Sequence, residues 1–309
     1  MNRYRTTSTH VRIRAGALAL LALLACRAGA AEPDTVPLHF INSLPFVGVR
    51  VGAVQSDMLF DSGGPLNISI PPSAAAASGA VTLLAEQAKF RDIQGEVHEV
   101  PMVVAKDIVI GRTPLPPVRG RIHVQWGGAP EGPDAPLTRA REAGTVGLGV
   151  FGDRPVMLDY AHGTMTLYAP GEGPQPGDAG WQTLRLEFGR IGPSVVLDVA
   201  GKPLRFVLDT GSPVTLVKPD SLPTKDGAGD CAPCLLSNVR DDSGHPIDAL
   251  RVQTMALGDV PFDGLLGAPF FSDRRVVFDV AAHRLLISAE GKAGQRPYIS
   301  THTMPQLCN

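Results

Sequence analysis

Two aspartates lie in closely matched contexts in the two halves of this chain. Asp61 is the second residue of Phe-Asp-Ser-Gly (60–63), and Asp209 is the second residue of Leu-Asp-Thr-Gly (208–211). Each follows an apolar segment and precedes a small-residue turn, a pattern that indicates the exit of a strand. Two carboxyl groups held close together cannot both ionise, so one serves as general acid and the other as general base toward a water molecule. The pattern predicts catalysis by Asp61 and Asp209, with no metal and no cofactor.

The residues next to both acids fit this chemistry. A glycine two places after each acid permits a tight turn whose backbone N–H groups point at the carboxylate. The hydroxyl residue between acid and glycine can donate a hydrogen bond into the facing turn. We therefore expect the two loops to be supported by Ser62, Gly63, Thr210, Gly211 and Ser212.

A longer repeat surrounds the two acidic turns. Residues 144–159 align without a gap, 120 positions on, to residues 264–279, and Gly147 matches Gly267. An apolar strand is predicted after each block, at 164–168 and 284–288. We expect Gly147 and Gly267 to end short apolar strands. The abundance of glycine and proline, 34 and 28 residues, favours strands and loops over helices.

Each half also contains a hairpin-like segment with a glycine at its turn. The first is at 92–96, with Gln94 and Gly95, and the second is at 241–245, with Ser243 and Gly244. The first half is longer between its acid and its glycine strand, and we place the extra residues at 126–142. One helix is predicted in the alanine-rich stretch 74–88.

These motifs together resemble the aspartic peptidases of the retropepsin/pepsin clan, in a two-lobed, single-chain, bacterial-type form. The resemblance covers about residues 37–290. It implies an all-β fold of two homologous acid-protease lobes, of the double-psi closed barrel type, with the active site between them. It also implies that Asp61 and Asp209 are catalytic, that the strands ending at Gly147 and Gly267 pass behind them, and that the two hairpins are flaps over the substrate.

The resemblance implies an endopeptidase that acts on a peptide or unfolded protein. Because one chain carries both acids, a monomer is sufficient for the paired chemistry. Two departures from the family pattern leave an alternative, a catalytically inactive peptide-binding protein on the same fold. Gly64 stands where pepsin-like loops have a hydroxyl residue, and no flap tyrosine is identifiable near Gly95.

Residues 1–30 have the pattern of an export signal. Four arginines precede an apolar run at 15–25, which is shorter than the roughly 20 residues of a membrane-spanning helix. Two processing routes are open: cleavage after Ala30, or acylation of Cys26 as a lipid anchor. We expect an exported protein, periplasmic or secreted, or else a lipoprotein.

The remaining chain is predicted to form a lobe at 34–172, a glycine- and proline-rich linker at 173–180, a second lobe at 181–290 and a tail at 291–309. Export implies an oxidising compartment, so Cys231 and Cys234 are candidates for a local disulfide. Cys308 is left over, to pair with either of them or with none.

Charge and motif content exclude several other functions. A formal net charge of −2 provides no positive field for nucleic acid. The histidines have no metal-ligand spacing. A glycine-rich run at 147–152 matches the dinucleotide-binding fingerprint, but a strand-like segment rather than a helix follows it, which argues against nucleotide binding.

Overall fold

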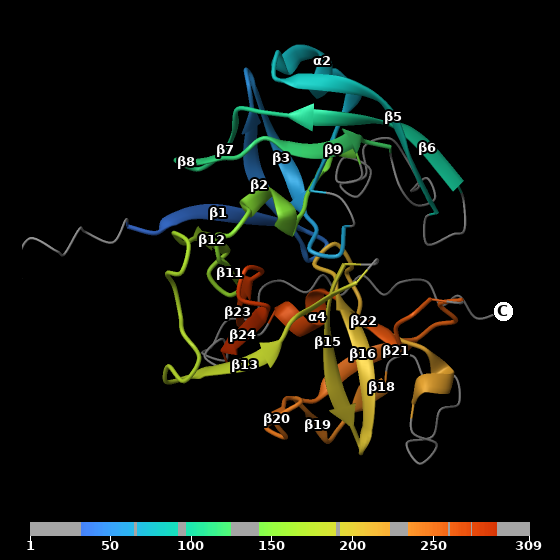
Figure 1. Cartoon of the computed structure of the whole chain (residues 1–309). Helices are drawn as coiled ribbons and strands as arrows, with labels where there is room; N and C mark the ends of the chain where they lie inside the picture. The colour runs from blue at the N-terminus through green and yellow to red at the C-terminus, as the bar shows by residue number, and fades with distance from the viewer. Residues whose placement is uncertain are drawn as a thin grey trace, which may run out of the picture. The chain divides into compact units, whose positions relative to one another are not determined.

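The computed structural model describes residues 32–64, 67–91, 97–124, 142–189, 192–222, 234–258, 260–272 and 274–288 (Figure 1). Pro33–Asn309 forms one compact unit, and every contact discussed below lies within it. The predicted leader with Cys26, the predicted tail, and the predicted insertion apart from residue 142 all lie outside the described residues.

Most of the first lobe consists of strands. They are β1 (Asp34–Ile41), β2 (Leu44–Val51), β3 (Val54–Phe60), β4 (Ile68–Ile70), β5 (Val81–Arg91), β6 (Val97–Ala105), β7 (Ile108–Ile110), β8 (Thr113–Leu115), β9 (Val118–Ile122), β10 (Thr145–Val146), β11 (Val156–Asp159) and β12 (Thr164–Leu167). The described helical segments are α2 (Pro72–Ser78) and the short η1 (Leu148–Phe151).

The second lobe follows the same plan. Its strands are β13 (Trp181–Arg185), β14 (Glu187–Gly189), β15 (Gly192–Val199), β16 (Lys202–Leu208), β17 (Leu216–Val217), β18 (Cys234–Leu236), β19 (Val239–Arg240), β20 (Pro246–Ile247), β21 (Leu250–Thr254), β22 (Gly264–Leu266), β23 (Arg275–Asp279) and β24 (Arg284–Ser288). Its helical segments are η2 (Pro219–Ser221) and α4 (Ala268–Phe271). The prediction of an all-β, two-lobed fold is confirmed.

The helix predicted over 74–88 forms only at 74–78, and residues 81–88 belong to strand β5. Helix α2 ends at Ser78, where Gly79 adopts a left-handed conformation (φ 66°) that terminates the helix. The chain then continues as strand β5, which begins with the β-branched pair Val81 and Thr82. The alanines at 74–77 favour the helix, but the glycine and the β-branched residues end it.

Strands β3 and β16 lead the two acids into the interior of the molecule. In β3 the first residues alternate between half-buried and exposed, while Met58, Leu59 and Phe60 at its end are all buried. In β16 the last three residues, 206–208, are buried in the same way. An apolar strand end of this kind must be covered on both faces, so the next residue emerges inside the molecule. Asp61 and Asp209 are those next residues.

The two acid-bearing strands have the same neighbours. Strand β10 lies parallel to β3, with Val146 opposite Phe60, and separates it from β4. Strand β22 lies parallel to β16, with Leu266 opposite Leu208, and separates it from β17. In each lobe a strand from late in the chain therefore runs beside the strand that delivers the acid.

A sheet shared by both halves of the chain joins the lobes. Its strands lie in the order β13-β24-β23-β11-β12-β1, so that β11 of one half pairs antiparallel with β23 of the other (Figure 1). Met157 faces Val277, its own counterpart in the repeat, at the centre of this pairing. An approximate twofold axis passes through that pair, because each half contributes the same residues in opposite directions.

Candidate active site

The backbone anchors Asp61 and Asp209 in the same way. The N–H of Asp61 donates to the carbonyl oxygen of Val146 on β10 at 3.0 Å, and the N–H of Asp209 donates to that of Leu266 on β22 at 2.9 Å. Each acid is thus tied to the strand beside it before its own turn begins. The two carboxyl groups are consequently presented from matching backbone positions.

Reciprocal hydrogen bonds tie the two acidic turns together. The Thr210 hydroxyl donates to the carbonyl oxygen of Phe60 at 2.6 Å and accepts from the N–H of Ser62 at 2.9 Å. The Ser62 hydroxyl donates to the carbonyl oxygen of Leu208 at 2.9 Å and accepts from the N–H of Thr210 at 3.1 Å. Both side chains are buried, so these bonds lie away from water and fix the turns relative to each other.

The two carboxyl groups converge on the facing glycines. A Cβ placed on Gly211 would lie 3.0 Å from Cγ of Asp61 and 3.1 Å from Oδ1 of Asp209. A Cβ placed on Gly63 would lie 2.9 Å from Cγ of Asp209. Both positions therefore exclude a side chain, and the carboxyl groups reach one common region next to Gly211.

The environment raises the pKa of both carboxyl groups. Burial is the main cause for Asp61, opposed by a hydrogen bond with Asp209, by backbone N–H groups at 63 and 64, and by the charge of Arg121. For Asp209 burial, the charge of Asp61 and the hydrogen bond between the two acids raise the pKa well above its ordinary value. The site therefore favours one shared proton on the pair, which titrates as a unit.

Ser212 and Gly64 make the same kind of contact to their acids, although only Ser212 has a hydroxyl group. The Ser212 hydroxyl donates to the carbonyl oxygen of Val214 at 2.8 Å and so turns along its own loop. What Ser212 offers Asp209 is its backbone N–H, which helps to lower the carboxyl pKa. The backbone N–H of Gly64 acts on Asp61 in the same sense. The missing hydroxyl at Gly64 therefore removes no contact that the other loop makes to its acid.

The glycines after β10 and β22 lie against the acid-bearing loops. The N–H of Gly147 donates to the carbonyl oxygen of Asn67 at 2.7 Å, and the N–H of Gly267 donates to the Thr215 hydroxyl at 3.1 Å. A Cβ on Gly267 would lie only 2.1 Å from the carbonyl oxygen of Val214. The close approach of two backbones thus requires glycine at this point.

The prediction that Ser243 and Gly244 form a flap over the acids is wrong. This turn connects β19 to β20, and β19 pairs with β15 at Val199, the end of β15 farthest from Asp209. At about 3.3 Å per residue, that end lies about 16 Å along the strand from Ser194. The turn therefore does not cover the carboxyl groups. The other flap candidates, Gln94 and Gly95, lie outside the described residues.

Strand pairing shows what the second turn corresponds to. In the first lobe β7 pairs with β2 at Val51, and in the second β19 pairs with β15 at Val199, 148 positions later. The equivalent of the Ser243–Gly244 turn is therefore the β7–β8 turn at Gly111, not the hairpin at 92–96. The segments 92–96 and 241–245 look alike in sequence because each contains an Asp and a Gly, but they are not equivalent in the two lobes.

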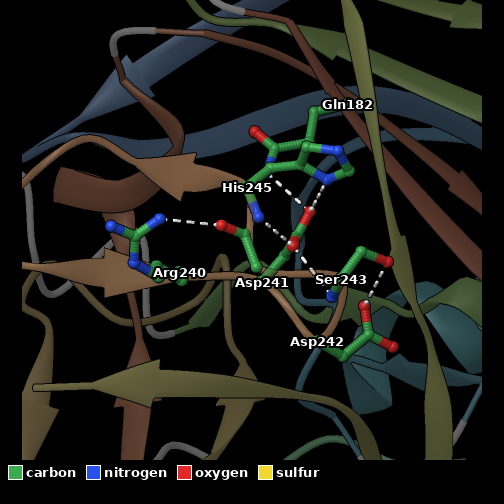
Figure 2. Close-up of polar contacts among 7 residues, drawn as sticks. Gln182, Arg240, Asp241, Asp242, Ser243 and His245 are labelled. Carbon is green, nitrogen blue, oxygen red and sulfur yellow. Dashed lines mark hydrogen bonds and ion pairs between the residues drawn. The ribbon is translucent and has the colours of Figure 1, made fainter. Parts of the chain in front are cut away.

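Asp241 organises this turn, as Figure 2 shows. Its carboxylate accepts backbone N–H groups from Ser243 at 2.9 Å and His245 at 2.8 Å, and the Gln182 amide at 2.8 Å. Burial alone would raise the pKa of Asp241, but the hydrogen bonds from Gln182, His245 and Ser243 together hold it below its ordinary value. The turn is a structural joint between β13 and the β19–β20 hairpin.

The predicted disulfide between Cys231 and Cys234 is not tested by the described residues. Cys231 and Cys308 lie outside the described residues, and Cys234 opens strand β18. Within the described ranges no cluster of His, Cys, Asp or Glu is arranged to hold a metal ion. No helix in the described part of the chain is long and apolar enough to cross a membrane.

Two residues near the acids were not identified from the sequence. Tyr160 is buried, and burial together with the charge of Asp209 raises its pKa. Arg121 on β9 interacts electrostatically with Asp61 and helps to lower the pKa of that carboxyl. Neither residue belongs to a repeated motif, so only the folded chain relates them to the acids.

Comparisons with known proteins place the fold but not a family. No protein-family model matches the chain, and no curated protein sequence matches it. Among solved structures, the chain is similar to basic 7S globulin from soybean, with a TM-score of 0.54 and 13% sequence identity. The match covers 83% of this chain and 95% of the globulin.

The predicted membership of the retropepsin/pepsin clan of aspartic peptidases is wrong on these findings. The similar solved structure, basic 7S globulin, is only 13% identical to this chain, and neither a family model nor a curated sequence links the chain to a peptidase family. The repeated acid-turn motif therefore indicates a backbone arrangement and does not by itself establish a family. What the chain has is a pepsin-like fold of two lobes.

Proposed function

We propose that this protein is an endopeptidase that hydrolyses peptide bonds by activating water between Asp61 and Asp209. The observation that supports this most is the convergence of both carboxyl groups within 3.1 Å of the position a Cβ of Gly211 would take. The proposal rests on this geometry and not on family membership. It includes export of the chain, as predicted from the leader at 1–30.

The chemistry follows from a pair that holds one proton. The ionised carboxylate takes a proton from water while the water oxygen attacks the carbonyl carbon, and the protonated carboxyl donates its proton to the carbonyl oxygen. The resulting tetrahedral diol collapses when one hydroxyl proton returns to the pair, the other carboxyl protonates the leaving nitrogen, and the C–N bond breaks. The pair ends with one proton, as it began.

Hydrolysis of an unfolded protein tests this proposal. The purified protein is incubated with a reduced, alkylated protein substrate between about pH 3 and 7, the range over which a shared dyad titrates. We expect cleavage that falls by at least about 100-fold in kcat/KM when either Asp61→Asn or Asp209→Asn is introduced, because general acid–base catalysis contributes at least this factor. Asp242→Asn, an exposed acid in the β19–β20 turn, is the matched control.

A peptide-binding protein that does not cleave is the second candidate. It is supported by the structural similarity to a protein that is named a globulin rather than a peptidase. The same incubation separates the two functions, since binding of the unfolded substrate without any cleavage across the whole pH range would favour the second. Full activity in either Asp→Asn variant would contradict the shared-dyad mechanism.

A further inference from the structure

Arg121 lies on a sheet face that faces away from the core of the first lobe. On β9, Gly120 points toward Ile68 in the core, so Arg121 points to the opposite face. Arg121 is paired with Met102 on β6, and on the same face of β6 His98 is paired with Phe90 of β5. Figure 1 shows β5 and β6 as a long pair that extends beyond β9.

An aromatic ring holds the guanidinium group in place. The Cζ atom of Arg121 lies 3.8 Å from the ring centroid of Phe90, close enough for a cation–π contact. Phe90 in turn stacks on the His98 ring, with centroids 5.1 Å apart. One face of the planar guanidinium is therefore covered, which leaves its edge to make hydrogen bonds.

Two nitrogen atoms of this guanidinium lack a partner within the part of the chain that the structure describes. Nε and Nη1 of Arg121 are buried, and neither has a hydrogen-bond acceptor among the residues that the structure describes. An arginine stays charged in proteins, and a buried charge without hydrogen bonds costs several kcal/mol in general. Each of these nitrogen atoms can donate a hydrogen bond to an anionic oxygen, and a carboxylate is the group that a guanidinium pairs with best in proteins.

Arg119 shows what a purely structural arginine does on the same face. It precedes Arg121 by two residues and forms a solvent-exposed ion pair with Glu86. Arg121 forms no such pair with a described residue, although it interacts electrostatically with Asp61. Since the acid pair is expected to retain only one negative charge, Arg121 adds a positive charge with two unpaired nitrogen atoms within electrostatic range of the acids.

We propose that Arg121 is a specificity-determining residue that binds a carboxylate of the substrate near the scissile bond. The ligand class is a peptide with an acidic side chain or a free C-terminal carboxylate in that position. The inference rests on the proposed function, because it assigns a substrate preference to the same site. Three observations support it: the Phe90 ring covers one face of the guanidinium, two buried nitrogen atoms have no acceptor among the described residues, and Arg121 interacts electrostatically with Asp61.

Matched peptides test the preference directly. Each pair has the same sequence, with Asp or Glu replaced by Asn or Gln at one position beside the cleaved bond, and each peptide is made with a free and with an amidated C-terminus. We expect kcat/KM of the wild-type protein to favour one carboxylate form by about 10- to 100-fold, the usual strength of a hydrogen bond between charged groups. The side-chain and C-terminal arms identify which carboxylate is bound.

Substitutions at Arg121 then assign the preference. In Arg121→Gln and Arg121→Met the acid-to-amide ratio should fall toward 1, and in Arg121→Lys it should be partly retained. Arg119→Gln, the neighbouring control, should keep the wild-type ratio. A ratio that is unchanged in Arg121→Gln overturns the inference, as does an equal loss on all peptides with a shifted pH profile, because Arg121 would then act on the acid pair alone.

Binding separates this inference from the proposed function. The Asp209→Asn protein is titrated with the same fluorescently labelled peptides, and the dissociation constants are compared with those of Asp209→Asn combined with Arg121→Gln. We expect the single variant to bind the carboxylate form more tightly by the same factor, and the double variant to lose that difference. If no peptide is ever cleaved but this difference is present, the proposed hydrolysis fails while the anion-binding role of Arg121 stands; equal binding of both forms overturns it.

Discussion

Ser62 and Thr210 show how single residues determine whether this site can form. Their hydroxyl groups and backbone N–H groups exchange four hydrogen bonds between loops that are 148 residues apart in the chain. The carboxyl groups lie one residue before them, so any shift of one turn moves an acid. The same bonds therefore serve both stability and the geometry of Asp61 and Asp209.

Replacing Thr210 by valine tests this role. The methyl group keeps the side-chain volume, but the buried N–H of Ser62 and carbonyl oxygen of Phe60 lose their partner. Each unsatisfied buried group costs about 1–3 kcal/mol, so we expect the free energy of unfolding to fall by about 2–6 kcal/mol in urea titrations. Thr210→Ser keeps the hydroxyl and should lose only about 1 kcal/mol. Equal losses in both variants would contradict the hydrogen-bond explanation.

At the scale of the elements, the decisive arrangement is a late strand inserted beside the acid-bearing strand in each lobe. Carbonyl groups of β10 and β22 accept hydrogen bonds from the N–H groups of Asp61 and Asp209, and each strand is followed directly by a glycine. After β22 the chain passes so close to the loop at 212–214 that a side chain has no space. Gly267 thus allows β22 to pack against the loop at 212–214, and this packing helps to position Asp209.

Gly267→Ala tests the close approach. The new Cβ would meet the backbone oxygen of Val214 at 2.1 Å, which a side-chain rotation cannot relieve. We expect a loss of about 1–3 kcal/mol or more in the free energy of unfolding, together with a lower kcat for peptide cleavage. Gly48→Ala on β2 is the control, because there the new Cβ meets only the ends of flexible side chains, Gln55 at 3.0 Å and Asp57 at 3.7 Å. Similar losses in both variants would show that the backbone contact is not the cause.

The whole molecule brings the two half-sites together through its shared sheet. Strands β11 and β23 pair across the approximate twofold axis, and the buried rings of Phe60 and Phe278, from opposite halves, lie 6.2 Å apart behind the acids. The protonation of the acid pair is therefore linked to the stability of the entire fold. Burial raises the pKa of both carboxyl groups, and the charge of Asp61 raises that of Asp209 further, so ionisation works against folding.

The sign of this linkage can be measured with Asp209→Asn. Because the folded pKa lies above the unfolded value of about 3.9, the folded state binds more protons between the two values, and wild-type stability falls as pH rises through that window. We expect Asp209→Asn to have a higher Tm than the wild type at pH 7, and the difference to shrink as pH falls toward about 4. Asp242→Asn, an exposed acid, should show no such trend. A constant difference at all pH values would contradict the raised pKa.

Part of the site was predictable because it depends on short-range backbone rules. Asp61, Gly63 and their counterparts stand at strand exits, where the chemical types of adjacent residues define the turn. The predicted strands 164–168 and 284–288 correspond to β12 and β24 for the same reason. The turn at 241–245 was assigned wrongly because its Asp and Gly define a local shape that several hairpins share, whereas its position depends on the pairing of β19 with β15.

The two acid turns, the glycine strands and the all-β, two-lobed plan could be predicted from the residues alone, since these follow from local conformational preference and from repetition along the chain. The placement of each hairpin, and the electrostatic interactions of Arg121 and Tyr160 with the acids, depend on the folded chain. Strand register and burial arise from contacts between distant segments, and a single arginine or tyrosine in a strand has no local pattern that reports them. The family was likewise not determined by the motif, because one backbone arrangement is compatible with very different sequences.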